Sequence, residues 1–159
     1  MRCFITLAIL FSISGCNFSK VSTSSVSDET LPSEKIIPRS MKVTIQALDD
    51  ANENTPVAVD VVYTLSQELA QKLSTMSAKE YFKMRDQLIR DYINLVMIHG
   101  WEIPPGHTVK EEMNALHPQT QAAFLFADYD VPGVHRSKLP VFENLYVHLK
   151  RADFKIMTV

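Results

Sequence analysis

The sequence predicts a mainly β protein: a β-sandwich that carries a helical insert after its second strand. Three observations support this fold class. Two runs of alternating apolar and polar residues occur close together, two amphipathic helical segments follow them directly, and short apolar runs separated by turn residues complete the chain. Strands outnumber helices and do not alternate with them as in βαβ units, and many short strands with turn signals are typical of a sandwich.

The two alternating runs cover residues 41–48 and 57–65, with a polar connection between them. Alternation with a period of two predicts strands that bury one face. The apolar positions are Val43, Ile45 and Ala47 in the first run, and Val57, Val59, Val61, Tyr63 and Leu65 in the second. The opposite face of the second run carries Asp60, Val62 and Thr64, so we expect this face to be partly covered.

The helical insert contains two segments. Ser66 can cap a short first helix, whose apolar positions are Leu69, Leu73 and Met76. Residues 77–80 have the form of a capping box, in which a hydroxyl and a carboxylate satisfy free amides at a helix start. The apolar positions of the second helix are Tyr81, Phe82, Leu88, Ile89 and Tyr92, and we interpret its aromatics as core anchors. We expect both helices at one edge or end of the sandwich.

The rest of the chain is predicted to form strands joined by turns and one long loop. Residues 93–98 and 101–103 have strand character on either side of Gly100, and Pro104-Pro105-Gly106 predicts a turn. A short helix is possible at 110–116. The remaining strands are predicted at 119–127, 145–149 and 154–159, with the long loop at 128–140.

The first residues resemble a bacterial lipobox. Arg2 precedes an apolar run at 4–13, which ends in Ser14-Gly15-Cys16. Small residues suit a signal peptidase, and the cysteine thiol can form a thioether to diacylglycerol. The run is shorter than the about 20 residues that a membrane-spanning helix needs. We therefore expect cleavage before Cys16 and lipidation of its thiol; a plain signal peptide with a chance cysteine is the alternative.

These features divide the chain into a signal peptide (1–15), a lipidated Cys16 with a Ser-rich tether (16–40), and a β-sandwich domain (41–159). Several acyl chains, palmitate among them, would hold the protein on a membrane without a spanning segment. A flexible tether of this length has a root-mean-square reach of about 25–30 Å. Position 17 is Asn and not the Asp that favours retention at the inner membrane. By resemblance to the enteric sorting rule, we expect the protein at the periplasmic face of the outer membrane.

Composition excludes several classes of function. The net charge of −2, without a basic run, argues against nucleic acid as a partner. The two cysteines are Cys3, inside the signal, and Cys16, so we expect no disulfide, thiol nucleophile or zinc–cysteine site in the mature domain. We expect no cofactor beyond the covalent lipid on Cys16, and no metal.

Candidates for catalysis are few. The five histidines are scattered and lack the helical spacing of a zinc site. His107 and His117 flank the possible short helix, but a metal there lacks a third ligand. His135-Arg136 could bind an anion, although a structural pair in a loop is more common. Asp128 and Asp130 could pair as carboxylates or serve a loop. Without a Gly-x-Ser-x-Gly motif or a phosphate loop, we predict a protein that is not an enzyme.

The motifs together resemble one family. They are the lipobox, the tether, residues 43–47 (VTIQA) and residues 56–65 (PVAVDVVYTL). Glu80-Tyr81-Phe82, residues 103–106, and residues 122–129 followed by His135-Arg136 extend the similarity along the domain. This pattern resembles the TssJ family, the small outer-membrane lipoproteins of the bacterial type VI secretion system. The resemblance implies a transthyretin-like or immunoglobulin-like β-sandwich.

The resemblance also implies a tethering role. TssJ lipoproteins bind the periplasmic C-terminal region of TssM, a large inner-membrane protein, and the loop between their first two strands takes part. By position, that loop corresponds here to Asp49, Asp50, Ala51, Asn52, Glu53, Asn54 and Thr55. An uninvolved polar turn is the alternative for this loop. A pilotin-like lipoprotein for an outer-membrane channel, and a lipid-anchored ligand binder or hydrolase, remain the alternative functions.

Overall fold

The computed structural model describes residues 40–114, 116–140 and 143–158. The predicted signal peptide, Cys16 and all but the last residue of the predicted tether lie outside the described residues. Within the described residues, no helix is both long enough and apolar enough to cross a membrane.

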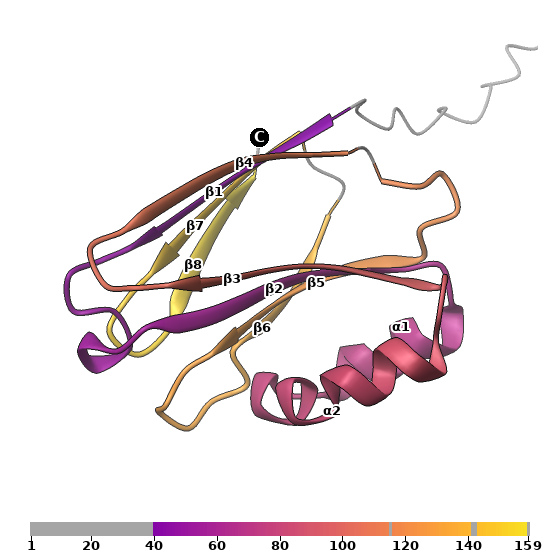
Figure 1. Ribbon diagram of the computed structural model, residues 1–159, viewed down its shortest axis with the longest axis horizontal. Coiled ribbons are helices and arrows are strands. Elements are labelled where there is room, and N and C mark those ends of the chain that lie inside the picture. Colours follow the sequence, from indigo (N-terminus) through magenta and orange to yellow (C-terminus); the bar gives the residue numbers. More distant parts are fainter. Residues whose placement is uncertain (1–39, 115, 141–142, 159) are drawn as a thin grey trace, which may run out of the picture. The chain divides into compact units, whose positions relative to one another are not determined.

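Two four-stranded sheets form a β-sandwich, which confirms the predicted fold class (Figure 1). The first sheet has the strand order β4-β1-β7-β8 and the second β3-β2-β5-β6. The strands are β1 (Ser40–Ala47), β2 (Val57–Thr64), β3 (Val96–Ile103), β4 (Thr108–Asn114), β5 (Ala122–Asp128), β6 (Arg136–Leu139), β7 (Asn144–Leu149) and β8 (Phe154–Thr158). Neighbouring strands are antiparallel except β1 and β7, which are parallel.

Strand register defines two ends of the sandwich. At one end, Ser40 pairs with Asn114 in the first sheet and Thr64 pairs with Val96 in the second; we call this the tether end. The four-residue turn 104–107 joins β3 to β4 at the other end, which we call the loop end. Three more connections lie at the loop end: 48–56, 129–135 and 150–153. The strands that they join end or begin there, since Ala47 pairs with Leu149 and Ala58 pairs with Asp128.

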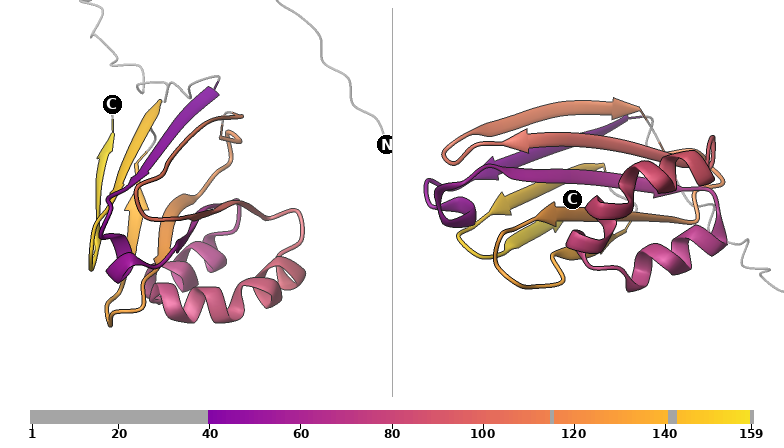
Figure 2. Two further views of the ribbon diagram at one scale, coloured as in Figure 1. Left: turned by 60° about the vertical axis from the view of Figure 1, so that its left-hand side comes forward. Right: turned by 60° about the horizontal axis from the view of Figure 1, so that its bottom comes forward.

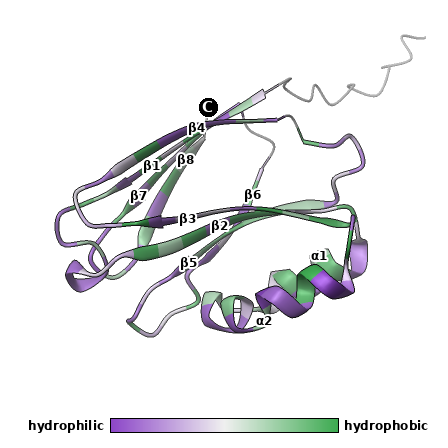
Figure 3. Cartoon of the chain, in the orientation of Figure 1, coloured by the Kyte–Doolittle hydropathy of each residue, from purple (hydrophilic) through white to green (hydrophobic). Residues whose placement is uncertain are grey.

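The main core lies between the sheets. It contains the inward side chains of the two alternating runs and their partners on the other strands. Figure 3 shows the alternation of hydrophobic and hydrophilic residues along these strands as green and purple segments. The large members of the core include Met41, Ile45, Ile103, Leu125, Tyr129 and Leu145. Trp101 on β3 packs against this core and donates a 2.7 Å hydrogen bond from Nε1 to Glu111 on β4, so the pair links the two sheets at one side of the sandwich.

Two helices cover the other face of the second sheet (Figure 2). They are α1 (Gln67–Thr75) and α2 (Ala78–Asp91), and a second buried cluster joins them to β2 and β5. Ser66 caps α1 and the predicted capping box at Ser77 and Glu80 begins α2. The expectation that the helices sit at an edge or end is wrong. The reason is the outward face of β2, which carries Val62 and so needs a cover.

Asp60 anchors α2 to the sheet. Its buried carboxylate accepts a 2.7 Å hydrogen bond from the Tyr81 hydroxyl and a 2.6 Å bond from Arg85 Nε. Burial and the neighbouring Asp60 raise the pKa of Tyr81. A side chain at Gly100 on β3 would collide with the Asp60 carboxylate, so glycine leaves the room that this cluster needs.

Three predicted elements differ from the structure. Residues 110–114 of the possible helix at 110–116 form part of a strand instead, because the turn at 104–107 folds Thr108–Asn114 back as an edge strand against β1. The predicted loop at 128–140 contains β6, a four-residue edge strand that pairs with β5. Residues 96–103 form one strand through Gly100 rather than two segments.

Candidate functional site

The loop predicted to contact a partner, Asp49–Thr55, lies at the loop end between β1 and β2. It holds the short 3-10 turn η1 (Ala51–Asn54). Backbone hydrogen bonds fix its position: Leu48 O accepts from Ala51 N at 3.0 Å and from Gly106 N at 3.2 Å, and Asn52 N donates to Lys150 O at 3.2 Å. The loop is therefore bonded to the two turns beside it, 104–107 and 150–153.

Asn52 holds the loop from within. Its side chain is buried, and Oδ1 accepts a 2.8 Å hydrogen bond from the Asp130 backbone N–H. Its Nδ2 donates to Thr55 Oγ1 at 2.6 Å and to Pro56 O at 3.2 Å. Thr55 Oγ1 donates in turn to Asp130 Oδ2 at 3.1 Å. Since a buried amide with this many partners has one orientation, the loop is held in a single conformation.

Three successive residues of the loop have left-handed backbone conformations. The φ angles are 44° at Asn52, 54° at Glu53 and 69° at Asn54. Asparagine tolerates this region better than most residues, whereas glutamate rarely adopts it. The Asn52 hydrogen bonds offset this backbone cost.

Exposure divides the predicted binding residues into two groups. Ala51 and Asn52 are buried, and the other residues of the loop are exposed. Asp49, Asp50 and Glu53 therefore present their carboxylates to solvent, and Arg151 Nη2 lies 3.7 Å from Glu53 Oε1. The surface that the loop offers to a partner is acidic and rigid, while two of its seven residues serve to shape it.

Replacing Glu53 with glycine is expected to raise the free energy of unfolding by about 0.5–1 kcal/mol, because relief of the left-handed strain exceeds the added entropy of the unfolded chain. The loss of the exposed ion pair with Arg151 has little effect. Asp50, with a φ of −101°, is the matched control, and Asp50→Gly should destabilise the domain. Urea denaturation of both variants tests this, and equal destabilisation would contradict it.

The other candidate sites do not assemble. His107 and His117 lie beyond opposite ends of β4, whose seven residues alone span about 23 Å at the usual rise of a strand. Within the described residues, no group of three or more His, Cys, Asp or Glu side chains could hold a metal ion. Asp128 and Asp130 do not pair: Lys79 Nζ lies 3.1 Å from Asp128 Oδ1, and Asp130 bonds to the loop.

His135-Arg136 is a structural pair. The buried His135 ring packs on Tyr129 with ring centroids 4.8 Å apart, and its Nε2 lies 3.0 Å from Val131 O. Arg136 donates to the carbonyl of Met76, just past the end of α1. Arg151 was missed by sequence reasoning, and Asp130 was considered only as a partner of Asp128 or as a loop residue, because only the fold brings both beside residues 49–55.

The geometry can be compared with known proteins. No protein-family model matches this chain, and no curated protein matches it in sequence. Among solved structures, it is similar to the type VI secretion lipoprotein TssJ1 from Pseudomonas aeruginosa, with a TM-score of 0.61 and 17% identity over 77% of this chain and 97% of TssJ1. The chain has the fold of TssJ1.

The TssJ-like fold is also found in two other matches. One is Lip of Serratia marcescens, a membrane-bound component of the type VI secretion system, with a TM-score of 0.54 and 10% identity over 75% of this chain and 97% of Lip. The other is a chain from the structure of the TssM C-terminal domain from EAEC, with a TM-score of 0.57 and 12% identity over 78% of this chain and 100% of that chain.

Proposed function

We propose that this protein is a non-enzymatic lipoprotein of a type VI-like secretion machine. Cys16 anchors it to the periplasmic face of the outer membrane, and the loop Asp49–Thr55 holds the periplasmic part of a TssM-like inner-membrane protein. The observation that carries the proposal is the rigid acidic loop on a fold shared with TssJ1 and Lip.

The position of the loop supports a tethering role. β1 begins at Ser40, next to the tether, and ends at Ala47, next to the loop. Its eight residues rise about 3.3 Å each, so the lipid-bearing chain and the loop leave the domain ~25 Å apart. A partner that crosses the periplasm from the inner membrane would meet the loop end first when the tether end faces the outer membrane.

The chemistry of the loop defines the surface that it would recognise. Asp49, Asp50 and Glu53 are exposed, and the fixed backbone around Asn52 removes most of the ordering cost of binding. An acidic, preorganised surface favours a basic patch on the partner and an association rate that falls as salt rises.

Co-purification of the full-length lipoprotein from envelope extract tests the proposal. Asp49→Asn/Asp50→Asn/Glu53→Gln removes the charge without touching the buried Asn52, so the domain should stay folded. We expect a large inner-membrane protein to co-purify with the unaltered protein and to be reduced about tenfold or more with this triple variant, as for lost rim charges at low salt.

The matched control neutralises three exposed acids elsewhere, Asp86→Asn/Asp91→Asn/Glu112→Gln, and should keep the partner. Equal recovery with both triple variants would show that the loop is not the contact. Recovery of an outer-membrane channel subunit would instead indicate a pilotin, and recovery of no protein at low salt would leave a ligand-binding lipoprotein.

A further inference from the structure

The corner between α2 and β3 exposes an apolar surface that the proposed loop contact does not use. Three of the eight large hydrophobic side chains exposed among the described residues lie in this one segment, on or next to α2. They are Ile89 (38% exposed), Ile93 (71%) and Leu95 (43%), which we call the α2–β3 corner. Apolar groups concentrated in this way mark surfaces that contact a protein or a membrane.

The corner is a fixed part of the fold. Tyr92 N donates to Leu88 O at 3.0 Å, and Leu95 N donates to Tyr92 O at 2.9 Å. Asn94 adopts a left-handed φ of 62°, which turns the chain from helix to strand. Leu95 O then accepts from Leu65 N at 2.8 Å. Ile93 and Leu95 therefore project from a hydrogen-bonded turn that directly follows α2, and their exposure is a property of the folded state.

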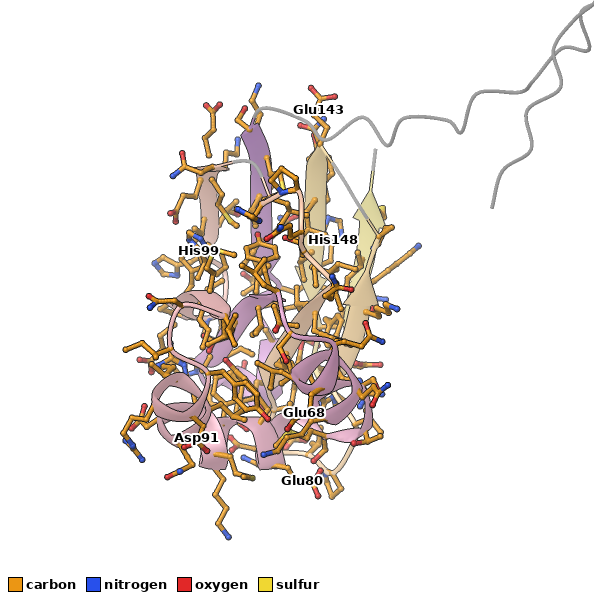
Figure 4. All side chains as sticks on the ribbon, turned by 90° about the vertical axis from the view of Figure 1, so that its right-hand side faces the viewer. Glu68, Glu80, Asp91, His99, Glu143 and His148 are labelled. Atoms are coloured by element: carbon orange, nitrogen blue, oxygen red, sulfur yellow. The ribbon has the colours of Figure 1, made fainter. Side chains whose placement is uncertain are left out.

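The corner lies at the tether end. Thr64 pairs with Val96, and α2 runs towards this end from Ala78, whose N–H bonds to Val134 O near the loop end. Figure 4 looks onto this end and shows Asp91, the last residue of α2, among the helices that face the viewer. Ser40, where the chain leaves towards Cys16, belongs to the same end.

We propose that the α2–β3 corner contacts the surface of the membrane that holds the lipid anchor, and so orients the domain with its loop end pointing away. This inference rests on the proposed function, because it needs lipid on Cys16. The part of the chain outside the structure indicates the occupant, because only the 23 residues 17–39 separate the tether end from Cys16.

The tether also makes a small apolar contact sufficient. A group linked to the membrane meets it at a high effective concentration, so a contact too weak to bind from solution becomes occupied. Segment 89–97 contains one basic and one acidic residue, Arg90 and Asp91, and has no net charge. The contact is therefore apolar and differs from the salt-sensitive loop contact proposed above.

Depth-dependent fluorescence quenching tests the orientation. The chain has two cysteines, one in the signal and one bearing the lipid, so Ile93→Cys provides a single free thiol for a bimane label. The full-length lipidated protein is reconstituted in phosphatidylethanolamine–phosphatidylglycerol vesicles that contain nitroxide-labelled lipid. We expect severalfold stronger quenching at position 93 than at Val134→Cys, which is 55% exposed near the loop end, and no change with added salt.

A second variant separates contact from proximity. Adding Ile93→Glu to an Ile89→Cys label should lower quenching at position 89, whereas adding Val134→Glu should not. Equal quenching at positions 93 and 134, no quenching at 93, or quenching that falls with salt would each overturn the proposal. Shielding of position 93 only after a partner protein is added would assign the corner to that protein and overturn it as well.

Mass spectrometry of the N-terminal peptide distinguishes the two possible failures. An acylated Cys16 without quenching at position 93 overturns the membrane contact alone. An N-terminus without acyl chains overturns the lipoprotein function, and the membrane contact with it.

Discussion

Arg85→Met is expected to lower the free energy of unfolding by about 3 kcal/mol, because it leaves the buried Asp60 carboxylate without its cation. The Arg85 side chain is 34% exposed, whereas that of Asp60 is 5% exposed. The main cost of the replacement is therefore the uncompensated charge that remains on the buried Asp60. The Tyr81 hydroxyl remains as a hydrogen-bond donor but cannot neutralise the charge. Urea denaturation measures the change.

The matched control is Lys83→Met, which removes an exposed cation from the same helix and should change stability by no more than about 0.5 kcal/mol. The combined replacement Asp60→Leu/Tyr81→Phe/Arg85→Met should recover most of the loss, because an apolar cluster has no charge to desolvate. If Arg85→Met and Lys83→Met behave alike, the cluster does not anchor α2.

Asn52→Ala is expected to cost about 2–3 kcal/mol, because it removes the hydrogen bonds that the side-chain amide makes and leaves the Asp130 N–H without its acceptor. The replacement also places alanine at a φ of 44°. We expect Asn52→Ala to bind the partner more weakly than Asp49→Asn/Asp50→Asn/Glu53→Gln does, since the loop would lose its conformation as well as its contacts.

Asn54→Ala separates these two causes. Asn54 also has a left-handed φ, of 69°, but its side chain is exposed. Its replacement should therefore cost only the backbone strain, about 1 kcal/mol. Thermal unfolding measures the stability lost in Asn52→Ala and in Asn54→Ala, and the difference between the two losses is the contribution of the Asn52 hydrogen bonds. Equal losses would mean that the Asn52 side chain does not hold the loop.

Local sequence patterns correctly predicted the strands and helices whose formation depends on residues close together in the chain. Alternation located β1 and β2, and the spacing of Ser77 and Glu80 located the start of α2, since each signal depends on residues a few positions apart. β6 was missed, because its four residues carry no alternation and form a strand only by pairing with β5.

Long-range contacts explain what sequence reasoning missed in the candidate site. Asn52 looks like any loop asparagine in the sequence, and its burial depends on Asp130, which lies 78 positions away in the chain. The Asp60 cluster is similar: the sequence predicts that the face of β2 with Asp60 is partly covered, but only the fold identifies Arg85 and Tyr81 as the partners of this acid. Only the assembled fold distinguishes the residues that shape the loop from those that a partner can touch.

The place of β1 in its sheet has a mechanical consequence. A force applied to the N-terminal chain enters the domain at Ser40 and runs along a strand paired with β4 on one side and β7 on the other. The ladder hydrogen bonds lie across the strand, so a pull that the rest of the domain resists would load them together in shear and not open them one after another. Since β1 continues directly into Asp49–Thr55, tension between a lipid and a partner at that loop would pass along a single doubly paired strand, while the rest of the sandwich carries little of the load.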